Sequence, residues 1–413
     1  MTVFTRDDFL KLDHQDPLAP FRNEFHIPQG VIYMDGNSLG AMPKATPRRV
    51  REVTERQWAQ GLIKSWNTAD WFHAPRRIGD KIAAIIGAEQ GEVVATDSTG
   101  INLFKAISAA LMVNADRSVI VMEGSNFPTD NYMAQGLVEF LGHRHRIRFV
   151  EKEGIMDAMD DRVAVVCLTD VHYKTGHRLD MQAITARAHR HGALTVWDLC
   201  HSAGAVPVDL NDAGADFAVG CGYKYLNGGP GAPAFIFVAK RHQDRVKQPL
   251  TGWWSHRAPF EFTRDYEIAE GINRMLSGTQ PILSLCALEV GVDLMARADI
   301  HRIREKSKQM GDLFIAAVEQ QCDGYGFAIV SPRNADERGS QVSLSHKNGY
   351  AIMQALIERG VIGDFRAPEI LRFGLTPLYL RYADVWDAVE ILSDIMARQI
   401  WKDPKYHVRQ AVT

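Results

Sequence analysis

The segment that decides the fold runs from VAVVCL (163–168) through LDMQAITARAHRHG (179–192) to LTVW (194–197). The two outer stretches are short, β-branched and almost wholly apolar, which is typical of strands buried on both faces. The middle stretch repeats its apolar residues at helical spacing and ends on a glycine, which favours a helix. Strand, helix and strand in this order form a βαβ unit, and its right-handed crossover places the two strands side by side.

Three further apolar runs extend this sheet: SVIVM (118–122), DFAVG (216–220) and AFIFV (234–238). The stretch INLFKAISAALM (101–112), which DSTG (97–100) opens, predicts an apolar helix against the sheet. We therefore predict an α/β fold whose large domain has a mostly parallel sheet covered by helices.

The pattern changes beyond residue 280. One or two long helices are predicted over 282–321, followed by two strand candidates and two helices, VSLSH (342–346), YAIMQALIERG (350–360), ILRFGL (370–375) and AVEILSDIMARQI (388–400). These elements favour a smaller α+β domain at the C-terminus. The predicted division is an N-terminal arm at 1–44 that packs with the small domain, a large domain at 45–290 and a small domain at 291–413.

Composition excludes several classes of protein. The 413 residues are 46% hydrophobic and 23% charged, which is the mix of a globular chain rather than a disordered or collagen-like one. Lys and Arg number 47 against 50 Asp and Glu, so the net charge of −3 indicates no general affinity for nucleic acid or anionic membranes. The apolar runs are far shorter than the roughly 20 residues that a membrane span needs.

The five cysteines indicate a reducing compartment. They stand at 167, 200, 221, 286 and 322, odd in number and without the close pairing of a disulfide framework or a zinc site. The first residues, MTVFTRDDFLKLDHQD, lack the apolar core of a secretory signal. We expect a cytoplasmic protein with no bound metal.

Lys224 is the first candidate for chemistry. It lies in GCGYKYLNGGPGAP (220–233), directly after an apolar strand, and the glycines there allow a large group to approach the backbone. An amine in this place is able to form a Schiff base if burial or a nearby cation lowers its pKa. Taken alone, the same pattern also fits a solvated lysine at a strand end.

Asp198 strengthens the case, because it ends the predicted strand LTVW and so lies at the same edge of the sheet as Lys224. A carboxylate facing a pyridinium nitrogen and a lysine bonded to an aldehyde are the two groups that a pyridoxal phosphate site needs. An Asp in a turn or cap is the plainer alternative. His201, three residues further on, fits either a cofactor contact or a core histidine.

Two more stretches suit this cofactor. DSTGIN (97–102) offers hydroxyls and free N–H groups at a helix start, where a phosphate binds, although an ordinary helix cap has the same composition. In SNFPTDNY (125–132), Phe127 is able to stack on a flat ring while Asp130 reaches the edge of that ring. A core Phe in a loop is the alternative for Phe127.

Together these residues carry a family resemblance. Asp198 and His201 followed by GYKYLNGGPG (222–231) resemble fold-type I pyridoxal phosphate enzymes of the class V aminotransferase and cysteine desulfurase group. Five further stretches, in the expected order over nearly the whole chain, resemble the kynureninase family: IYMDGNSLGAMP (32–43), SNFPTD (125–130), GWWSH (252–256), SGTQPI (277–282) and ILRFGLTPLY (370–379).

The resemblance implies an aspartate-aminotransferase-like fold and a role for each matching residue. Lys224, Tyr223 and Asp198 are the implied catalytic residues. The implied cofactor contacts are the catalytic three with Thr99, Gly100, Phe127, Pro128, Thr129, Asp130, Thr169, His201, Trp253 and Thr279. In this set Asp198 pairs with the pyridinium nitrogen, His201 lies under the ring, and Thr99, Gly100, Tyr223 and Trp253 hold the phosphate.

Three further implications concern assembly and substrate. Thr279 resembles a residue that reaches in from a second subunit, which implies a homodimer with the active site at the subunit interface. Arg372 resembles the arginine that grips the substrate carboxylate, a task that suits the guanidinium fork. The implied substrate-binding set is Arg372, Trp66, Ser38 and Gly278.

The implied reaction is hydrolysis of L-kynurenine to anthranilate and L-alanine, a carbon–carbon bond cleavage in tryptophan degradation, the kynurenine pathway and NAD biosynthesis. The rival hypothesis is a cysteine desulfurase or β-lyase on the same fold. It is weakened by Tyr223, where desulfurases generally have His or another polar residue, and by the absence of a cysteine after Cys322. A regulator that binds the cofactor without catalysis is disfavoured by the lack of spare length and of a basic patch.

Overall fold

The structure is a computed structural model that describes residues 3–409. The chain separates into two compact units. The smaller is built from residues up to 44, from 171–178 and from residue 298 onward, and the larger from 45–170 and 179–297. The short segment 171–178 therefore leaves the larger unit for the smaller one and returns.

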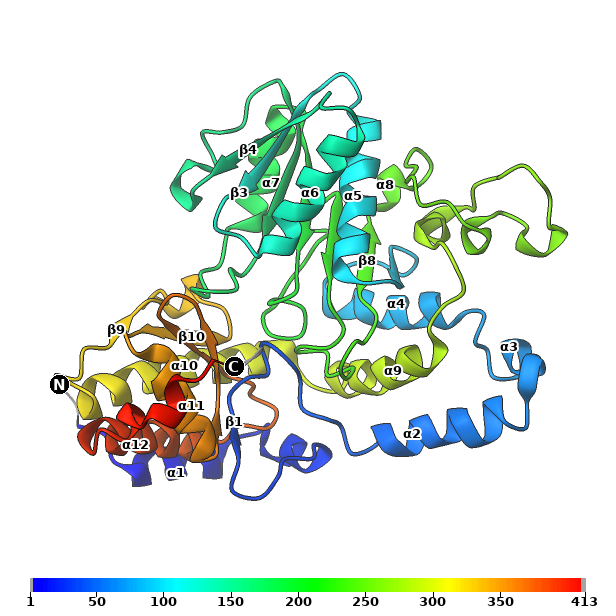
Figure 1. The fold of residues 1–413 in the computed structure, drawn as a ribbon. Helices are drawn as coiled ribbons and strands as arrows, with labels where there is room; N and C mark the ends of the chain where they lie inside the picture. Colours follow the sequence, from blue (N-terminus) through cyan, green and yellow to red (C-terminus); the bar gives the residue numbers. More distant parts are fainter. Residues whose placement is uncertain (1–2, 410–413) are drawn as a thin grey trace. The chain divides into compact units, whose positions relative to one another are not determined.

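The larger unit is organised around a seven-stranded sheet of order β2-β8-β7-β6-β5-β3-β4 (Figure 1). The strands are β2 (Val93–Ala95), β3 (Val119–Glu123), β4 (Arg146–Val150), β5 (Val163–Thr169), β6 (Leu194–Asp198), β7 (Phe217–Gly220) and β8 (Phe235–Val238). Strands β4, β3, β5, β6 and β7 are parallel, and β8 runs antiparallel to both of its neighbours. The predicted α/β class with a mostly parallel sheet is confirmed.

The larger unit also contains eight helices among the described residues. They are α2 (Thr46–Glu52), α3 (Ser65–Thr68), α4 (Ala74–Ile85), α5 (Thr99–Val113), α6 (Pro128–Phe140), α7 (Met181–Arg190), α8 (Lys240–Gln243) and α9 (Ile282–Ala296). Of these, α4, α5, α6 and α7 pack against the sheet. The apolar face of α5, drawn in cyan in Figure 1, packs into the main core with the central strands. Helices α4 and α9 lie side by side, joined by Glu289, whose carboxylate pairs with Arg77 and Lys81 at 3.0 and 2.9 Å.

The smaller unit contains an antiparallel sheet of order β12-β13-β10-β9. Its strands are β9 (Ala328–Ile329), β10 (Gln341–Ser345), β12 (Asp364–Arg366) and β13 (Ile370–Gly374), and a second, parallel pair joins β1 (Ile32–Tyr33) to β11 (Val361–Ile362). Its helices are α1 (Arg6–Gln15), α10 (Ile300–Gln321), α11 (Gly349–Glu358) and α12 (Tyr382–Ala397). The first residues of the chain thus form part of the same unit as the last.

The structure defines the bounds of two predicted segments, and only the second differs from its prediction. The apolar stretch 282–321 forms two helices, because Asp299 begins α10 by accepting a hydrogen bond from the backbone N–H of His301. Helix α12 begins at Tyr382, earlier than the predicted 388, because Asp384 accepts a hydrogen bond from the Arg381 backbone N–H at 2.8 Å and so caps the first turn. Strands β2 and β4 carry no clear pattern in the sequence and were not predicted.

Two further observations concern membrane-spanning segments and the cysteines. Within residues 3–409, no helix is long and apolar enough to cross a membrane. The cysteines at 167, 200, 221, 286 and 322 are all free thiols and all buried.

Candidate active site

The carboxyl ends of three strands align at one edge of the larger unit's sheet. Thr169 of β5 is the register partner of Asp198 of β6, which in turn pairs with Val219 of β7. The side chain of Asp198 is buried and accepts a hydrogen bond from the backbone N–H of Cys200 at 2.6 Å. Asp198 therefore lies at the strand ends where open α/β sheets bind their ligands, as the sequence predicted.

Lys224 follows β7 and meets His201 at this edge. Its Nζ lies 2.9 Å from Nε2 of His201 and 5.8 Å from the ring centroid of Tyr223. The loop before Lys224 needs a residue without a side chain at Gly222, because a Cβ there would lie 2.4 Å from the carbonyl oxygen of Pro233. The loop thus delivers the amine of Lys224 to the same edge as Asp198.

Asp130 and Asp198 form a pair of buried carboxyl groups. Asp130 lies in the first turn of α6 and receives hydrogen bonds from Asn126 Nδ2 at 2.9 Å and from Thr169 Oγ1 at 3.5 Å. Burial raises the pKa of Asp130 well above its usual range, and the charge of Asp198 and a hydrogen bond to it raise that pKa further. Such a pair favours a cationic N–H group beside it.

The N-termini of α5 and α6 converge. A Cβ on Gly100 would lie 2.8 Å from Met133 Cε and 3.2 Å from Thr129 Cγ2, so the start of α5 lies against the first turns of α6. The hydroxyl of Thr99 lies 3.5 Å from Sγ of Cys200, next to Asp198. The first N–H groups of a helix lack acceptors within the helix and carry its positive dipole end, which suits a phosphate.

These residues fit pyridoxal phosphate. Lys224 supplies an amine, and Asp198 supplies a carboxylate for a pyridinium N–H. The converging N-termini of α5 and α6 supply a place for the phosphate. Phe127 stands at the N-cap of α6, and 43% of its surface is exposed. Pro128 and Thr129 follow it in the first turn of that helix.

Tyr223 remains a proton donor near neutral pH. Burial raises the pKa of its phenol above the usual range, and the thiols of Cys221 and Cys200 and the carboxylate of Asp198 raise it further. A protonated phenol donates a hydrogen bond to an anion such as a phosphate or a developing oxyanion. The two roles implied for Tyr223, in catalysis and in holding the phosphate, both require the protonated phenol.

Trp253, Gly278 and Thr279 lie together on an exposed part of the larger unit. The backbone N–H of Trp254 donates to the carbonyl of Ser277 at 3.1 Å. The segment of Trp253 therefore lies alongside the segment of Gly278 and Thr279. Trp253 is 39% exposed, and Gly278 and Thr279 are exposed.

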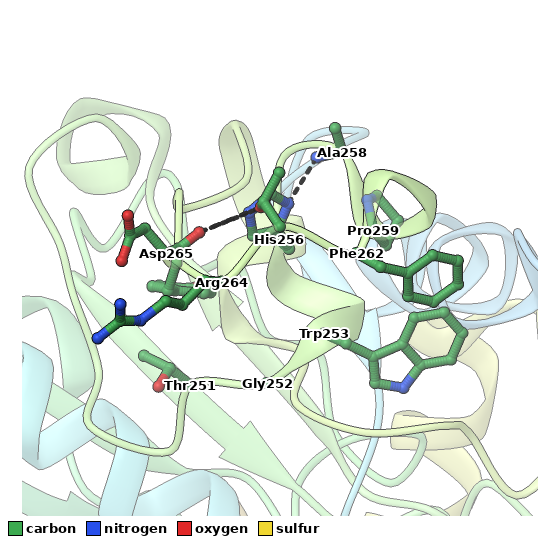
Figure 2. Close-up of a pocket in the computed structure, with 11 residues that line it drawn as sticks. Thr251, Gly252, Trp253, His256, Ala258, Pro259, Phe262, Arg264 and Asp265 are labelled. Carbon is green, nitrogen blue, oxygen red and sulfur yellow. Dashed lines mark hydrogen bonds between the residues drawn. The ribbon is translucent and has the colours of Figure 1, made fainter.

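Trp253 also lines a pocket, shown in Figure 2. The rings of Trp253 and Phe262 lie on one side of it, and His256 accepts a hydrogen bond from the Ala258 N–H at 2.9 Å. The neighbouring Phe260 and Phe262 are 62% and 78% exposed, which is unusual for such large apolar side chains.

Trp66 belongs to an aromatic cluster of the larger unit. Its ring contacts Trp71 edge-on at 5.6 Å and Trp254 at 5.2 Å, and the Trp71 indole donates to Gln57 Oε1 at 2.9 Å. The side chain is half-buried. Its contact with Trp254 places it one residue from Trp253, and its role towards substrate stays a prediction.

Arg372 and Ser38 meet in the smaller unit. Arg372 is buried in β13 and forms a two-pronged ion pair with Asp364, in which Nε lies 2.6 Å from Oδ1 and Nη2 contacts Oδ2. Nη2 also donates to Ser38 Oγ at 3.0 Å, and Nη1 donates to the carbonyl of Tyr173 at 2.6 Å. These bonds occupy the donors of Nε and Nη2 and leave one Nη1 hydrogen for a ligand.

Sequence reasoning missed several residues of these sites. Asn126 holds Thr169 Oγ1 at 2.7 Å as well as Asp130, and Cys200 supplies the N–H that fixes Asp198. Asp364 orients Arg372. Asn126 lies within SNFPTDNY (125–132), where only its neighbours were assigned roles, and Cys200 lies two residues after Asp198. Asp364 precedes its partner Arg372 by eight positions.

Solved structures share this fold. The apo cysteine desulfurase of Thermococcus onnurineus NA1 matches with a TM-score of 0.77 at 18% identity, over 92% of this chain and 98% of that one. A C-DES variant with glycine covalently linked to its PLP cofactor matches with a TM-score of 0.79 at 15% identity, over 90% and 99%. The chain therefore has the fold of the aspartate-aminotransferase-like class.

Full-length relatives narrow the class. The kynureninase of Burkholderia pseudomallei strain 1106a is 54% identical over 99% of this chain and 100% of its own length, and that of Pseudomonas fluorescens is 53% identical over the same shares. The model of the kynureninase C-terminal domain matches residues 303–392. The chain belongs to the kynureninase family. The desulfurases share its fold at much lower sequence identity. The desulfurase hypothesis is therefore not better supported than the kynureninase hypothesis.

Proposed function

We propose that this protein is a pyridoxal-phosphate-dependent hydrolase that cleaves the Cβ–Cγ bond of L-kynurenine to give anthranilate and L-alanine. The observation that carries the proposal is the approach of Lys224 Nζ to His201 Nε2, at 2.9 Å, beside the buried pair of Asp198 and Asp130. The full-length identity to kynureninases supports the same reaction. A place in tryptophan degradation and in the supply of NAD precursors follows from that substrate.

Each residue of the site has a task that its position suits. The cofactor, when bound, supplies an aldehyde that captures the substrate amine and a ring that accepts electrons from the breaking bonds. Lys224 holds the cofactor and, once displaced by substrate, moves the proton at the substrate Cα. Asp198 would keep the pyridine nitrogen protonated, and His201, whose Nε2 lies 2.9 Å from Lys224 Nζ, would hold that amine in place.

Tyr223 has two tasks in the proposal. Its phenol donates a hydrogen bond to the phosphate, together with Thr99, Gly100 and Trp253. It also supplies a proton near the substrate carbonyl while water adds there. Its raised pKa supports both, because the phenol keeps its proton at neutral pH.

Substrate recognition is divided between the amino acid end and the aromatic end. Arg372, oriented by Asp364 and Ser38, grips the substrate carboxylate with its remaining Nη1 hydrogen and its positive charge. Trp66 and Gly278 line the place of the aromatic ring. Both assignments rest on the family resemblance and on the positions reported above.

We further propose a homodimer in which Trp253 and Thr279 serve the partner's cofactor. Their exposure, and the exposed rings of Phe260 and Phe262 beside Trp253, support a contact with a second copy. Mixing inactive Lys224→Ala with inactive Trp253→Ala should restore activity, because each hybrid dimer has one intact site. No recovery in a mixture whose subunits exchange would contradict a shared site. The five free, buried cysteines suit a cytoplasmic location.

The decisive experiment is to incubate purified protein with L-kynurenine and follow the fluorescence of anthranilate. A parallel incubation with L-cysteine, scored for sulfide and alanine, tests the desulfurase reaction. Release of anthranilate without sulfide supports the proposal. Sulfide without anthranilate would overturn it.

A further inference from the structure

Lys105 is a fully buried lysine with specific partners. It lies on α5, and its side chain is 0% exposed. Its Nζ lies 2.5 Å from Oδ2 of Asp97 and 2.6 Å from the carbonyl oxygen of Met275. Burial lowers the pKa of Lys105, and the charge of Asp97 opposes that effect. An ammonium group is retained in such a place only where acceptors are aimed at it.

Asp97 shapes the turn that leads into the helix carrying Thr99 and Gly100. Its φ of 50° lies in the left-handed region, which a residue with a Cβ seldom adopts. Its carbonyl accepts a hydrogen bond from the Ala234 N–H at 2.9 Å, and its carboxylate meets Lys105. The ion pair therefore holds a strained residue two positions before the implied phosphate contacts.

The same turn is joined to the segment that contains Gly278 and Thr279. Lys105 reaches Met275 at the start of that segment. At its end, Gln280 accepts a hydrogen bond from Thr96 Oγ1 at 2.9 Å and donates one to the carbonyl of Gly278 at 2.8 Å. Both ends of 275–280 are thus tied to the turn at 96–97.

We propose that Lys105 is a positioning residue for the cofactor phosphate: by joining Asp97 to the carbonyl of Met275 it fixes the turn that presents the N–H groups of Thr99 and Gly100. The inference rests on the proposed function, which assigns those two residues to the phosphate. Lys105 lies about 9 Å along the helix from Thr99, at 1.5 Å per residue, so it acts through Asp97 rather than by contact with the ligand.

The effect is expected to be specific to the phosphate. Lys105→Met fills the same space without the charge, leaves the Asp97 carboxylate without its cation, and frees the turn before α5. Lys105 is hydrogen-bonded to Asp97 and Met275. Neither of these partners belongs to the residues proposed to hold the rest of the cofactor, which are Lys224, Asp198 and His201. Pyridoxal, which has the ring and aldehyde but no phosphate, is therefore the matched probe.

The test compares the dissociation constants of pyridoxal phosphate and of pyridoxal for full-length protein stripped of cofactor, by quenching of tryptophan fluorescence. In Lys105→Met the affinity for pyridoxal phosphate should fall by about tenfold or more, while that for pyridoxal changes by less than about threefold. Equal loss for both probes, or no loss for either, would overturn the proposal. If this variant does not fold, Lys105→Gln, which keeps a hydrogen-bond donor, replaces it with the same expectation.

Lys306 provides a control with similar chemistry. Its ammonium is buried in the smaller unit against Asp16 Oδ2 at 2.7 Å and the carbonyl oxygens of Pro377 and Leu380 at 2.6 and 2.8 Å. Lys306→Met should lower thermal stability and leave the ratio of the two affinities unchanged. A similar change of that ratio in Lys306→Met would show that any buried lysine has this effect. Failure of wild-type protein to release anthranilate would count against the proposed reaction, whereas the affinity ratio tests Lys105.

Discussion

The carboxyl groups of Asp130 and Asp198 are both buried at the carboxyl edge of the larger sheet, close enough for the charge of Asp198 to raise the pKa of Asp130. Two carboxylates in one apolar place do not ionise equally, and here burial raises the pKa of Asp130 so that it keeps its proton. Asp198 accepts its hydrogen bond from the backbone N–H of Cys200, whereas Asp130 accepts from the side chain of Asn126. This difference assigns separate roles to two residues of the same type.

Asp198→Asn is expected to leave the protein folded and able to bind cofactor, but nearly inactive. An amide is unable to keep the pyridine nitrogen protonated, so the ring no longer accepts electrons. The measurement is kcat for anthranilate release with cofactor content determined in the same sample. Asp130→Asn is the matched control and should lose less, because Asp130 is already neutral. Near wild-type turnover in Asp198→Asn would show that the assignment is wrong.

Lys224 should be the lysine that bonds the cofactor. Borohydride treatment of the loaded protein should bleach its yellow colour and fix the cofactor to the peptide that contains Lys224. Peptide mapping by mass spectrometry reads the result. Label on Lys105 or any other lysine would remove the basis of the proposed site.

Arg372→Ala should mainly raise KM, since the substrate carboxylate is gripped in the ground state and the transition state alike. The variant also leaves the buried Asp364 with Arg366 as its remaining ion-pair partner, so thermal stability should fall. Asp364→Asn, which keeps Arg372 but loosens it, should show a smaller rise in KM. An unchanged KM in Arg372→Ala would argue against carboxylate binding.

The pH dependence of stability should report on Asp35. Burial and the nearby charge of Asp364 raise the pKa of Asp35 to about 7, above the value of roughly 4 that an unfolded chain has. Between these values the folded state binds more protons than the unfolded state, so this contribution to stability is complete below pH 4 and is lost as pH rises to 7. Asp35→Asn, which does not ionise, should melt at a higher temperature than wild type at pH 8. At pH 5 the difference should shrink, and a constant difference would contradict the assignment.

Plain L-kynurenine should be preferred over 3-hydroxykynurenine. Trp66 presents an indole, whose face is apolar and whose single donor points one way, so a phenol placed against it lacks a partner. Leaving a hydroxyl unpaired costs on the order of 1–3 kcal/mol, which corresponds to about tenfold or more in kcat/KM. Paired measurements on the two substrates decide the matter. Equal values would indicate that Trp66 serves only the cluster with Trp71 and Trp254.

Much of the fold and of the cofactor site could be predicted from the sequence. Strands such as β5 and β6 are buried on both faces, so their apolar runs are visible without knowledge of their neighbours. Because parallel strands end at a common edge, Asp198 and the loop of Lys224 were placed together by strand order alone. Helix α7 followed from its 3.6-residue period and its terminal glycine.

The rest was decided by contacts between distant parts of the chain, which no local pattern encodes. Strand β8 pairs with β2, which lies about 140 residues earlier, and segment 171–178 joins the smaller unit, where His177 pairs with Arg338. The raised pKa of Asp130 depends on burial that only the assembled sheet provides. Lys105 looked like one polar residue in an apolar helix, and its role appears only when Met275, 170 positions later, supplies the acceptor. Local periodicity determines elements, whereas the pairing of buried charges is settled by packing.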